Sequence, residues 1–277
     1  MSHYIGIDGG GTSTKAALAN SKGEIIAESQ APPSNPHNVG YTKAAAAIYN
    51  SCQDLLDQTN LSSSSITTIA AGIAGLRTTK ETDQLRSQLN SYPLFHSANL
   101  YLTHDLEIAY YSELRKTPGL CIIVGTGSSC YARSPDAKEI RVSGRSNSFD
   151  DPASGYAIAS KAIAKGLIAE TRKSDSSKAN IASRASEVLA MLEDPIAQSI
   201  ATDEVKQLGA LAAEAALRAD FNSSFPVRLV GGMTRHPAYS EILVAIIQEA
   251  LPKGEIRIGN NRPLSGAIGL AINLIKG

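Results

Sequence analysis

The stretch Tyr4-Ile5-Gly6-Ile7-Asp8-Gly9-Gly10-Gly11-Thr12-Ser13-Thr14-Lys15 decides the fold, because it carries an apolar strand directly into a turn of glycine and hydroxyl residues. An apolar run at residues 16–19 leaves this turn, and a second turn at residues 21–23 leads to a further strand. Glycine lets backbone N–H groups come close to an anion, and neighbouring hydroxyl groups add hydrogen-bond donors. The stretch therefore predicts a β-hairpin whose turn can hold a phosphate group.

The same pattern occurs a second time in the middle of the chain. Apolar residues 120–124 run into Gly125-Thr126-Gly127-Ser128-Ser129, after which strands at 130–132 and 139–142 are joined by a turn. One such hairpin alone is more often an ordinary tight turn than a phosphate site. Its repetition indicates a duplicated architecture with two phosphate-binding turns. The sequence has neither a GxGxxG motif that opens a helix nor a GxxxxGK[ST] motif, which excludes the dinucleotide and P-loop folds.

Two further elements extend the pattern: a strand at 227–230 that ends in Gly231-Gly232-Met233, and the segment 262–271 near the end of the chain. In this order, the four elements resemble the actin-like ATPase and sugar kinase superfamily, and within it the N-acetylglucosamine kinase and BadF/BadG-type activator ATPase family. The resemblance runs from Tyr4 to about Ile275. It implies an α/β fold with two ribonuclease-H-like domains, each a mixed βββαβαβ sheet flanked by helices, and a cleft between the domains.

The expected domains are residues 1–117, with the sugar-binding loops, and residues 118–277, with the nucleotide site. The helix near residues 263–276 is free to pack back on the first domain. Helices are expected at 42–59, 79–89, from Asp105 onward, 156–170, 179–191 and 204–219, with strands near 66–71 and 100–103.

Composition limits the function classes. The chain has 277 residues, and its 26 basic and 26 acidic side chains balance, so no overall field favours nucleic acid or an anionic membrane. The N-terminus shows no signal segment and no apolar run is long enough to span a bilayer, which predicts a cytoplasmic protein. Cys52, Cys121 and Cys130 form no CxxC or Cys/His cluster, so reduced thiols are expected rather than disulfides or a zinc site.

The resemblance implies ATP and Mg²⁺ as cofactors. The residues that it assigns to ATP are Gly10, Gly11, Thr12, Ser13, Lys15, Gly125, Thr126, Gly127, Gly231, Gly232 and Met233. Asp8 is the metal candidate, because a carboxylate facing phosphates would repel them unless a cation lay between. Mg²⁺ suits that position, since it binds through few carboxylates together with phosphate oxygens and water.

Asp105 is the candidate catalytic residue. It follows a strand and opens a helix, so it lies at the carboxyl end of a strand, where α/β sheets gather ligand-binding groups. The residue pattern fits a helix cap and a general base equally well. The resemblance favours the base, because the matching aspartate in the family takes the proton of the acceptor hydroxyl, and it also counts Asp105 among the substrate-binding residues.

Two loops supply further acceptor-binding candidates. Asn35 resembles the sugar-binding asparagine of the family, although Ser-Asn-Pro is also a common turn composition, and Gly75 matches a glycine at which the backbone approaches the sugar. The second loop contributes Gly144, Arg145, Ser146 and Asp151.

This second loop departs from the family pattern Gly-Trp-Gly, spacer, Asp-Glu/Gln-Gly-Ser-Gly. Arg145 stands in place of the tryptophan, and Ala153 in place of a glycine. Either Arg145 pairs with a carboxylate or phosphate on the substrate through its planar guanidinium group, or the loop has lost its role.

The leading functional hypothesis is an ATP-dependent kinase that phosphorylates a hydroxyl of a sugar or amino sugar such as N-acetylglucosamine or glucosamine, with Asp105 as general base. The alternatives are an activator-type ATPase of the same family and a non-catalytic relative that binds sugar or nucleotide. The expected partner is a small sugar, and the sequence leaves open whether the protein is a homodimer.

Overall fold

The computed structural model describes residues 2–142, 151–170, 172 and 176–274, which form two compact units. The first unit comprises Met1–Arg115 and Asn261–Gly277, and the second comprises Lys116–Asn260. The last helix, which the sequence left free to pack back on the first domain, packs on the sheet of the first unit, so the second unit ends at Asn260.

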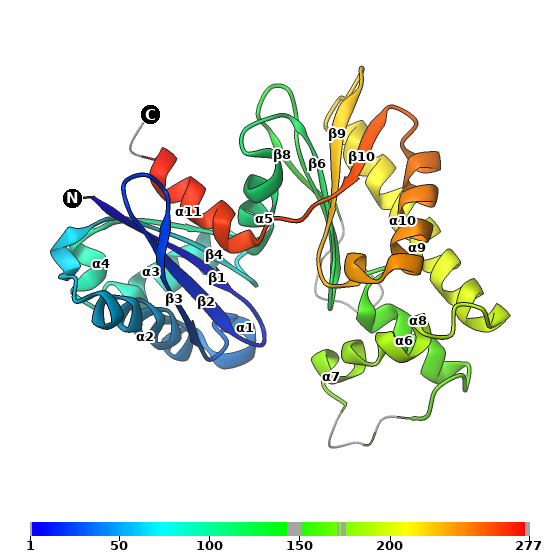
Figure 1. Cartoon of the computed structure of the whole chain (residues 1–277), viewed down its shortest axis with the longest axis horizontal. Coiled ribbons are helices and arrows are strands. Elements are labelled where there is room, and N and C mark those ends of the chain that lie inside the picture. The colour runs from blue at the N-terminus through cyan, green and yellow to red at the C-terminus, as the bar shows by residue number, and fades with distance from the viewer. Residues whose placement is uncertain (1, 143–150, 171, 173–175, 275–277) are drawn as a thin grey trace. The chain divides into compact units, whose positions relative to one another are not determined.

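The first unit is built on a mixed five-stranded sheet with the order β3-β2-β1-β4-β5 (Figure 1). The strands β1, β2 and β3 are joined by antiparallel hairpins, whereas β4 pairs parallel with β1 and β5 pairs parallel with β4. The elements are β1 (His3–Gly9), β2 (Thr14–Ala19), β3 (Ile25–Ala31), α1 (Pro36–Val39), α2 (Tyr41–Thr59), η1 (Ser63–Ser65), β4 (Ile66–Ile73), α3 (Thr79–Leu89), α4 (Leu94–Ser97), β5 (Asn99–Thr103), α5 (Asp105–Leu114) and α11 (Pro263–Asn273).

Helices cover both faces of this sheet, so its central strands are apolar on both sides. Ile5 and Ile7 of β1 pack in one cluster with Ile48 of α2, whereas Tyr4 of the same strand packs with Ala267 of α11. The alternation follows the two-residue period of a strand. Gly6 permits the close approach of α11, because a Cβ atom there would lie 2.6 Å from the backbone nitrogen of Ile268.

The second unit repeats this topology with the strand order β10-β9-β6-β7-β8. Here β6, β7 and β8 form the antiparallel hairpins, and β9 and β10 add parallel strands. The elements are β6 (Gly119–Val124), β7 (Ser128–Arg133), β8 (Glu139–Val142), α6 (Gly155–Ala164), α7 (Lys178–Ser183), α8 (Ala185–Leu189), α9 (Pro195–Arg218), β9 (Phe225–Val230), η3 (Met233–Arg235), α10 (Pro237–Ala250) and β10 (Gly254–Ile258). The predicted duplication is confirmed.

Three helix predictions in the second unit were wrong in their bounds. The helix expected at 156–170 ends at Ala164, and Gly166 follows it in the left-handed region at φ 68°. The helix expected at 179–191 is interrupted at Arg184 and forms α7 and α8. The helix expected at 204–219 begins at Pro195, because the Asp194 carboxylate accepts a hydrogen bond from the Ile196 N–H at 2.7 Å and caps it.

None of the helices in the described part of the chain combines the length and apolar character needed to span a membrane.

Candidate functional site

The β1–β2 turn of the first unit is held by backbone hydrogen bonds to two neighbouring segments. The Gly10 carbonyl accepts from the N–H groups of Ser34 and Asn35, both at 3.2 Å, and the Gly9 carbonyl accepts from Ala74 N–H at 2.7 Å. A Cβ atom on Gly9 would lie 2.3 Å from Ser34 Oγ, so only glycine fits there. The turn therefore brings the predicted phosphate-binding residues 10–13 beside the predicted sugar-binding loop.

Asp8 lies on β1 directly opposite Lys15 of β2. Burial is the main reason that the pKa of Asp8 rises from 3.8 to about 6, and the negative charge of Asp105 raises it further, while Lys15 and Arg262 act in the opposite direction. Asp8 and Asp105 are thus close enough for their charges to repel each other. This is an arrangement that a cation would relieve.

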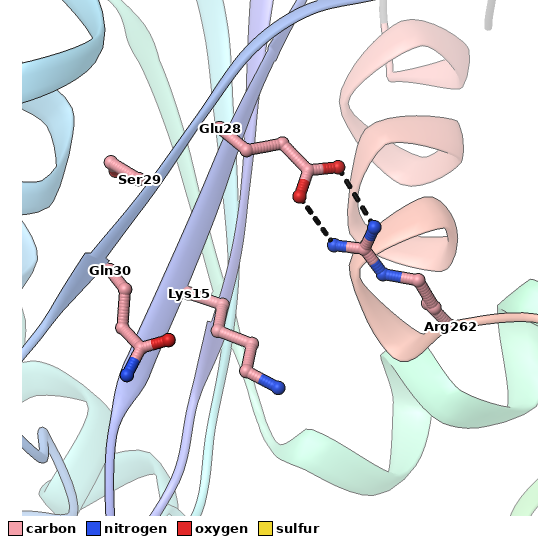
Figure 2. A pocket seen from close by; sticks show the side chains of 5 residues that line it. All are labelled: Lys15, Glu28, Ser29, Gln30 and Arg262. Atoms are coloured by element: carbon pink, nitrogen blue, oxygen red, sulfur yellow. Dashed lines mark hydrogen bonds and ion pairs between the residues drawn. The ribbon is translucent and has the colours of Figure 1, made fainter.

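A pocket of about 390 Å³ is lined by Lys15, Glu28, Ser29, Gln30 and Arg262 (Figure 2). Arg262, the residue before α11, forms two parallel hydrogen bonds with the Glu28 carboxylate at 2.9 and 2.8 Å. The bonds lower the pKa of Glu28 and raise that of Arg262. They hold the start of α11 against β3. Besides Lys15, Arg262 is thus a second cation whose charge acts on Asp8, and sequence analysis did not predict it.

Asp105 is the first residue of α5, and the cap of this helix is a different residue. His104 occupies the N-cap position, where its Nδ1 accepts a hydrogen bond from Glu107 N–H at 3.1 Å. Of the two roles that the sequence allowed for Asp105, the helix cap is therefore wrong.

Glu107 holds the β5–α5 junction, although sequence analysis did not select it. Its buried carboxylate accepts hydrogen bonds from Tyr101 Oη, at 3.0 and 3.1 Å, and from the hydroxyl of Thr103. These bonds connect the last residues of β5 to the first turn of α5. They therefore fix the backbone position of Asp105, which lies between Thr103 and Glu107 in the chain.

Asn35 caps the short helix α1, since its Oδ1 accepts from His37 N–H at 3.0 Å. The His37 Nε2 lies 2.9 Å from the Gly75 carbonyl oxygen and 3.0 Å from Glu81 Oε1. Gly75 has φ 94°, and a Cβ atom there would lie 2.5 Å from Asn35 Oδ1. The two predicted acceptor-binding residues are therefore adjacent, and Asn35 also has the turn role that its sequence context predicted.

The β6–β7 turn of the second unit is held in a similar way. The Gly125 carbonyl accepts from Gly155 N–H at 2.8 Å, and the Thr126 carbonyl accepts from Tyr156 N–H at 3.3 Å. Ser128 Oγ donates to the Pro152 carbonyl at 2.7 Å. The start of α6 is thereby tied to the second predicted phosphate-binding turn.

The predicted adenosine segment lies against the same turn. Gly231 has φ 117°, and a Cβ atom there would lie 2.3 Å from the Val124 carbonyl oxygen, whereas one on Gly232 would meet nothing within 4 Å. A Cβ atom on Gly155 would lie 3.3 Å from Met233 Sδ. The structure thus brings residues 125–127 and 231–233 together within one unit, as predicted.

The segment 151–154 is buried between this turn and α9. Asp151 pairs with Lys178 of α7, and Ala153 has φ 65°. The backbone of Ala153 is held from two sides, because its N–H donates to Glu204 at 2.8 Å and its carbonyl accepts from Tyr239 Oη at 2.7 Å. Burial raises the pKa of the Tyr239 hydroxyl, which remains a donor. The left-handed backbone explains why the family has glycine at this position.

Three of the predicted substrate residues, Gly144, Arg145 and Ser146, lie outside the described residues.

Residues 5–272 match the BadF/BadG/BcrA/BcrD ATPase family. The chain belongs to this family. A curated relative, the N-acetylmuramic acid/N-acetylglucosamine kinase of Clostridium acetobutylicum, is 28% identical over 167 residues, which cover 60% of this chain and 54% of that protein. The chain spans about half the length of the curated relatives it matches.

Solved structures with similar folds include a candidate N-acetylglucosamine kinase from Chromobacterium violaceum, with a TM-score of 0.77 and 22% identity over 98% of this chain and 99% of that one. A ROK family glucokinase from Streptomyces griseus, in complex with glucose and AMPPNP, has a TM-score of 0.65 and 17% identity over 99% of this chain and 100% of that one. These likenesses confirm the predicted actin-like ATPase fold.

The residues of this family member fit a nucleotide with a magnesium ion. Within the described residues, no group of three or more His, Cys, Asp or Glu side chains could hold a metal by itself. Mg²⁺ does not need such a group, since it is usually held by one or two carboxylates with phosphate oxygens and water. Asp8 and Asp105, whose charges repel each other, would be the carboxylates of such a site.

Cys52, Cys121 and Cys130 are buried and form no disulfide. Cys121 lies in β6 and Cys130 in β7, and burial raises the pKa of Cys52 and Cys130 to about 12. An iron–sulfur cluster is held by cysteine thiolates, which these environments disfavour.

Proposed function

We propose that this protein transfers the terminal phosphoryl group of ATP to a hydroxyl group of a sugar or amino sugar. The observation that carries the proposal is the position of Asp105. It lies at the carboxyl end of β5, beside Asp8, while His104 caps the helix in its place. An aspartate that is held at the ligand-binding edge of a sheet is a suitable general base.

In this proposal Asp105 accepts the proton of the acceptor hydroxyl as that oxygen attacks the phosphoryl group. A positioned base commonly contributes about a hundred- to ten-thousand-fold to the rate. Glu107 keeps Asp105 in place through the bonds of its carboxylate to Tyr101 and Thr103. Asn35 and Gly75, next to each other on the same unit, bind the acceptor.

Each unit has a glycine-rich turn that can bind phosphate groups of the nucleotide. In the first unit the backbone of residues 10–13 and the ammonium group of Lys15 face the phosphates, and Asp8 would hold the magnesium ion. A bound magnesium ion neutralises charge on the transferred phosphoryl group. In the second unit the backbone of residues 125–127 takes phosphate oxygens, and residues 231–233 border the nucleoside.

The kinase names of the curated relatives support this function over the two alternatives. Activator-type ATPases of the family use an iron–sulfur cluster, and the buried thiols of Cys52, Cys121 and Cys130 disfavour one here. A non-catalytic binding protein has no need for the Asp8–Asp105 pair, whose mutual repulsion costs stability.

A coupled assay of ADP release tests the proposal. Purified protein with Mg²⁺-ATP is assayed with glucosamine, N-acetylglucosamine, glucose, N-acetylmuramic acid or no sugar. We expect turnover with at least one sugar far above the sugar-free rate. Equal release with and without every sugar would favour the ATPase alternative, and no release under any condition would favour the binding protein.

A further inference from the structure

Asp151 is a buried carboxylate directly beneath the second glycine-rich turn. Its side chain is 5% exposed, and a Cβ atom on Gly127 would lie 3.1 Å from its Oδ2. Phosphates held by the backbone of this turn would therefore lie close to a negative charge. An uncompensated carboxylate at this position would oppose their binding.

Lys178 supplies the compensating charge. Its Nζ lies 2.5 Å from the same Oδ2 of Asp151 and 5.4 Å from the centre of the Tyr156 ring. Tyr156 in turn donates its N–H to the Thr126 carbonyl at 3.3 Å. The lysine ammonium is thus fixed by two neighbours that both contact the turn, one through charge and one through the face of an aromatic ring.

The ammonium of Lys178 is held but not enclosed. The lysine side chain is 41% exposed, in contrast to its buried partner. An ammonium group has three donors, so the bond to Asp151 leaves others for a ligand. The residues of this unit that were predicted to bind ATP, Gly125, Thr126, Gly127, Gly231, Gly232 and Met233, carry no charge of their own.

We propose that Lys178 is a phosphate-binding residue of the second turn, whose ammonium group donates to an oxygen of a bound nucleotide phosphate while Asp151 and Tyr156 fix its position. The inference rests on the proposed function only in taking the ligand to be an adenine nucleotide. It does not depend on which acceptor is phosphorylated, or on transfer taking place.

The second unit offers a matched control. Lys161 of α6 pairs with the buried carboxylate of Glu204, and the exposed fractions of these two side chains, 46% and 3%, are close to those of Lys178 and Asp151. Glu204 contacts the backbone of Ala153 instead of the turn. The loss of either lysine leaves a buried carboxylate unpaired, and only the loss of Lys178 removes a cation from beside the turn.

The experiment measures binding of Mg²⁺-ADP to the full chain by calorimetry. We expect Lys178→Met to weaken binding by about tenfold or more, since a charge-assisted hydrogen bond to phosphate is lost, and Lys161→Met to stay within about twofold. Both variants should show a similar fall in melting temperature. Equal ADP affinity in Lys178→Met and the parent overturns the inference, and so does an equal loss in both lysine variants.

Two more variants separate direct binding from charge compensation. Lys178→Arg keeps the positive charge and should retain most of the affinity, which also guards against a misfolded methionine variant. The double variant Asp151→Asn with Lys178→Met removes both charges; direct binding predicts that its affinity stays low, whereas recovery to the parent value overturns the inference. ADP binding that depends on Lys178 without sugar phosphorylation would refute the proposed function alone. A parent protein that binds no ADP would refute both.

Discussion

The two glycine-rich turns share one architecture but have different charge environments. In the first unit burial and, after it, the charge of Asp105 raise the pKa of Asp8 to about 6, whereas Lys15 and Arg262 act to lower it. In the second unit the buried Asp151 is paired with Lys178. Under the proposed function the two units have different tasks: the acidic groups of the first serve a cation and a proton, and the second holds phosphate through its backbone and Lys178.

The backbone connections support the same distinction. In both units the first glycine of the turn accepts hydrogen bonds from the next segment, residues 34 and 35 in the first unit and Gly155 in the second. The tied segment in the first unit leads to the short helix α1 with Asn35 at its cap. In the second it opens the ten-residue helix α6. The short helix α1 buries only Pro36, whereas most of α6 packs into the core.

The largest expected effect concerns the chemistry of the first unit. Asp105→Asn retains the size of the side chain but cannot accept a proton, so sugar-dependent turnover should fall by about two to four orders of magnitude. Because His104 caps α5, the melting temperature should hardly change. Steady-state kinetics and thermal melting together test this.

Glu107→Gln is the control for position at this site. Glutamine loses one acceptor for Tyr101 and Thr103, so it should lower the melting temperature and reduce turnover less than Asp105→Asn does. If Asp105→Asn retains turnover within a few-fold of the parent, Asp105 is not the base and the division of tasks between the units is wrong.

The next effect concerns the close packing of the Gly231 backbone in the second unit. Gly231→Ala should destabilise the protein by more than about 3 kcal/mol, because φ is 117° and the new methyl group would meet the carbonyl of Val124 at 2.3 Å. Gly232→Ala should be nearly neutral, since its methyl group meets no atom within 4 Å. Urea unfolding of the two variants measures the difference, and a similar loss in both would contradict the close packing of Gly231.

A smaller effect follows from the raised pKa of Asp8. Between about pH 4 and pH 6 the folded protein keeps a proton on Asp8 that the unfolded chain has lost, so this residue makes stability fall as the pH rises through that window. Asp8→Asn should remove this fall and be more stable above pH 6 by up to about 3 kcal/mol. Urea unfolding without nucleotide or magnesium, at several pH values, tests the sign.

Asp151→Asn is the comparison in the second unit. Its carboxylate is buried with Lys178, so the substitution leaves a lysine without its partner and should bring no gain in stability at pH 7. If both asparagine variants stabilise the protein, the two acids are not in different environments.

Local sequence patterns predicted most of the first unit. Helix α3 was expected at its observed bounds, and Asp105 at the carboxyl end of β5. These features depend on neighbours in the chain: the two-residue period of a strand, the glycines of a turn and the helix that follows it. The sequence also carries a signal for the start of α9, because Asp194 before Pro195 is a standard helix cap. The helix was nevertheless expected to begin only at residue 204.

The charged partners could not be predicted in this way. Arg262 meets Glu28, which is 234 residues away, and the Ala153 backbone meets Glu204, which is 51 residues away. Such pairs are determined by how distant elements pack, and no periodicity within one element carries this information. Lys178 was missed for the same reason, since it meets Asp151, which is 27 residues away, only in the folded unit.

The smallest expected effect concerns Ala153 of the second unit, which has a left-handed backbone although it is not glycine. At φ 65° alanine costs about 1–2 kcal/mol, which glycine would relieve. Two effects of Ala153→Gly oppose this relief. The lost buried methyl group costs about 0.8 kcal/mol of stability, and the greater conformational freedom of the unfolded chain costs about 0.4–1 kcal/mol. The terms nearly cancel, so the stability should change by less than about 0.5 kcal/mol.

Ala159→Gly gives the reference, because Ala159 is equally buried but lies within α6, where no strain is relieved. It should cost about 2 kcal/mol, the sum of the lost methyl group and the helix penalty of glycine. The difference between the stability losses of the two variants measures the backbone strain at Ala153. An equal loss in the free energy of unfolding of both variants would mean that the bonds to Glu204 and Tyr239 hold Ala153 without strain. The left-handed backbone would then not explain why the family has glycine at this position.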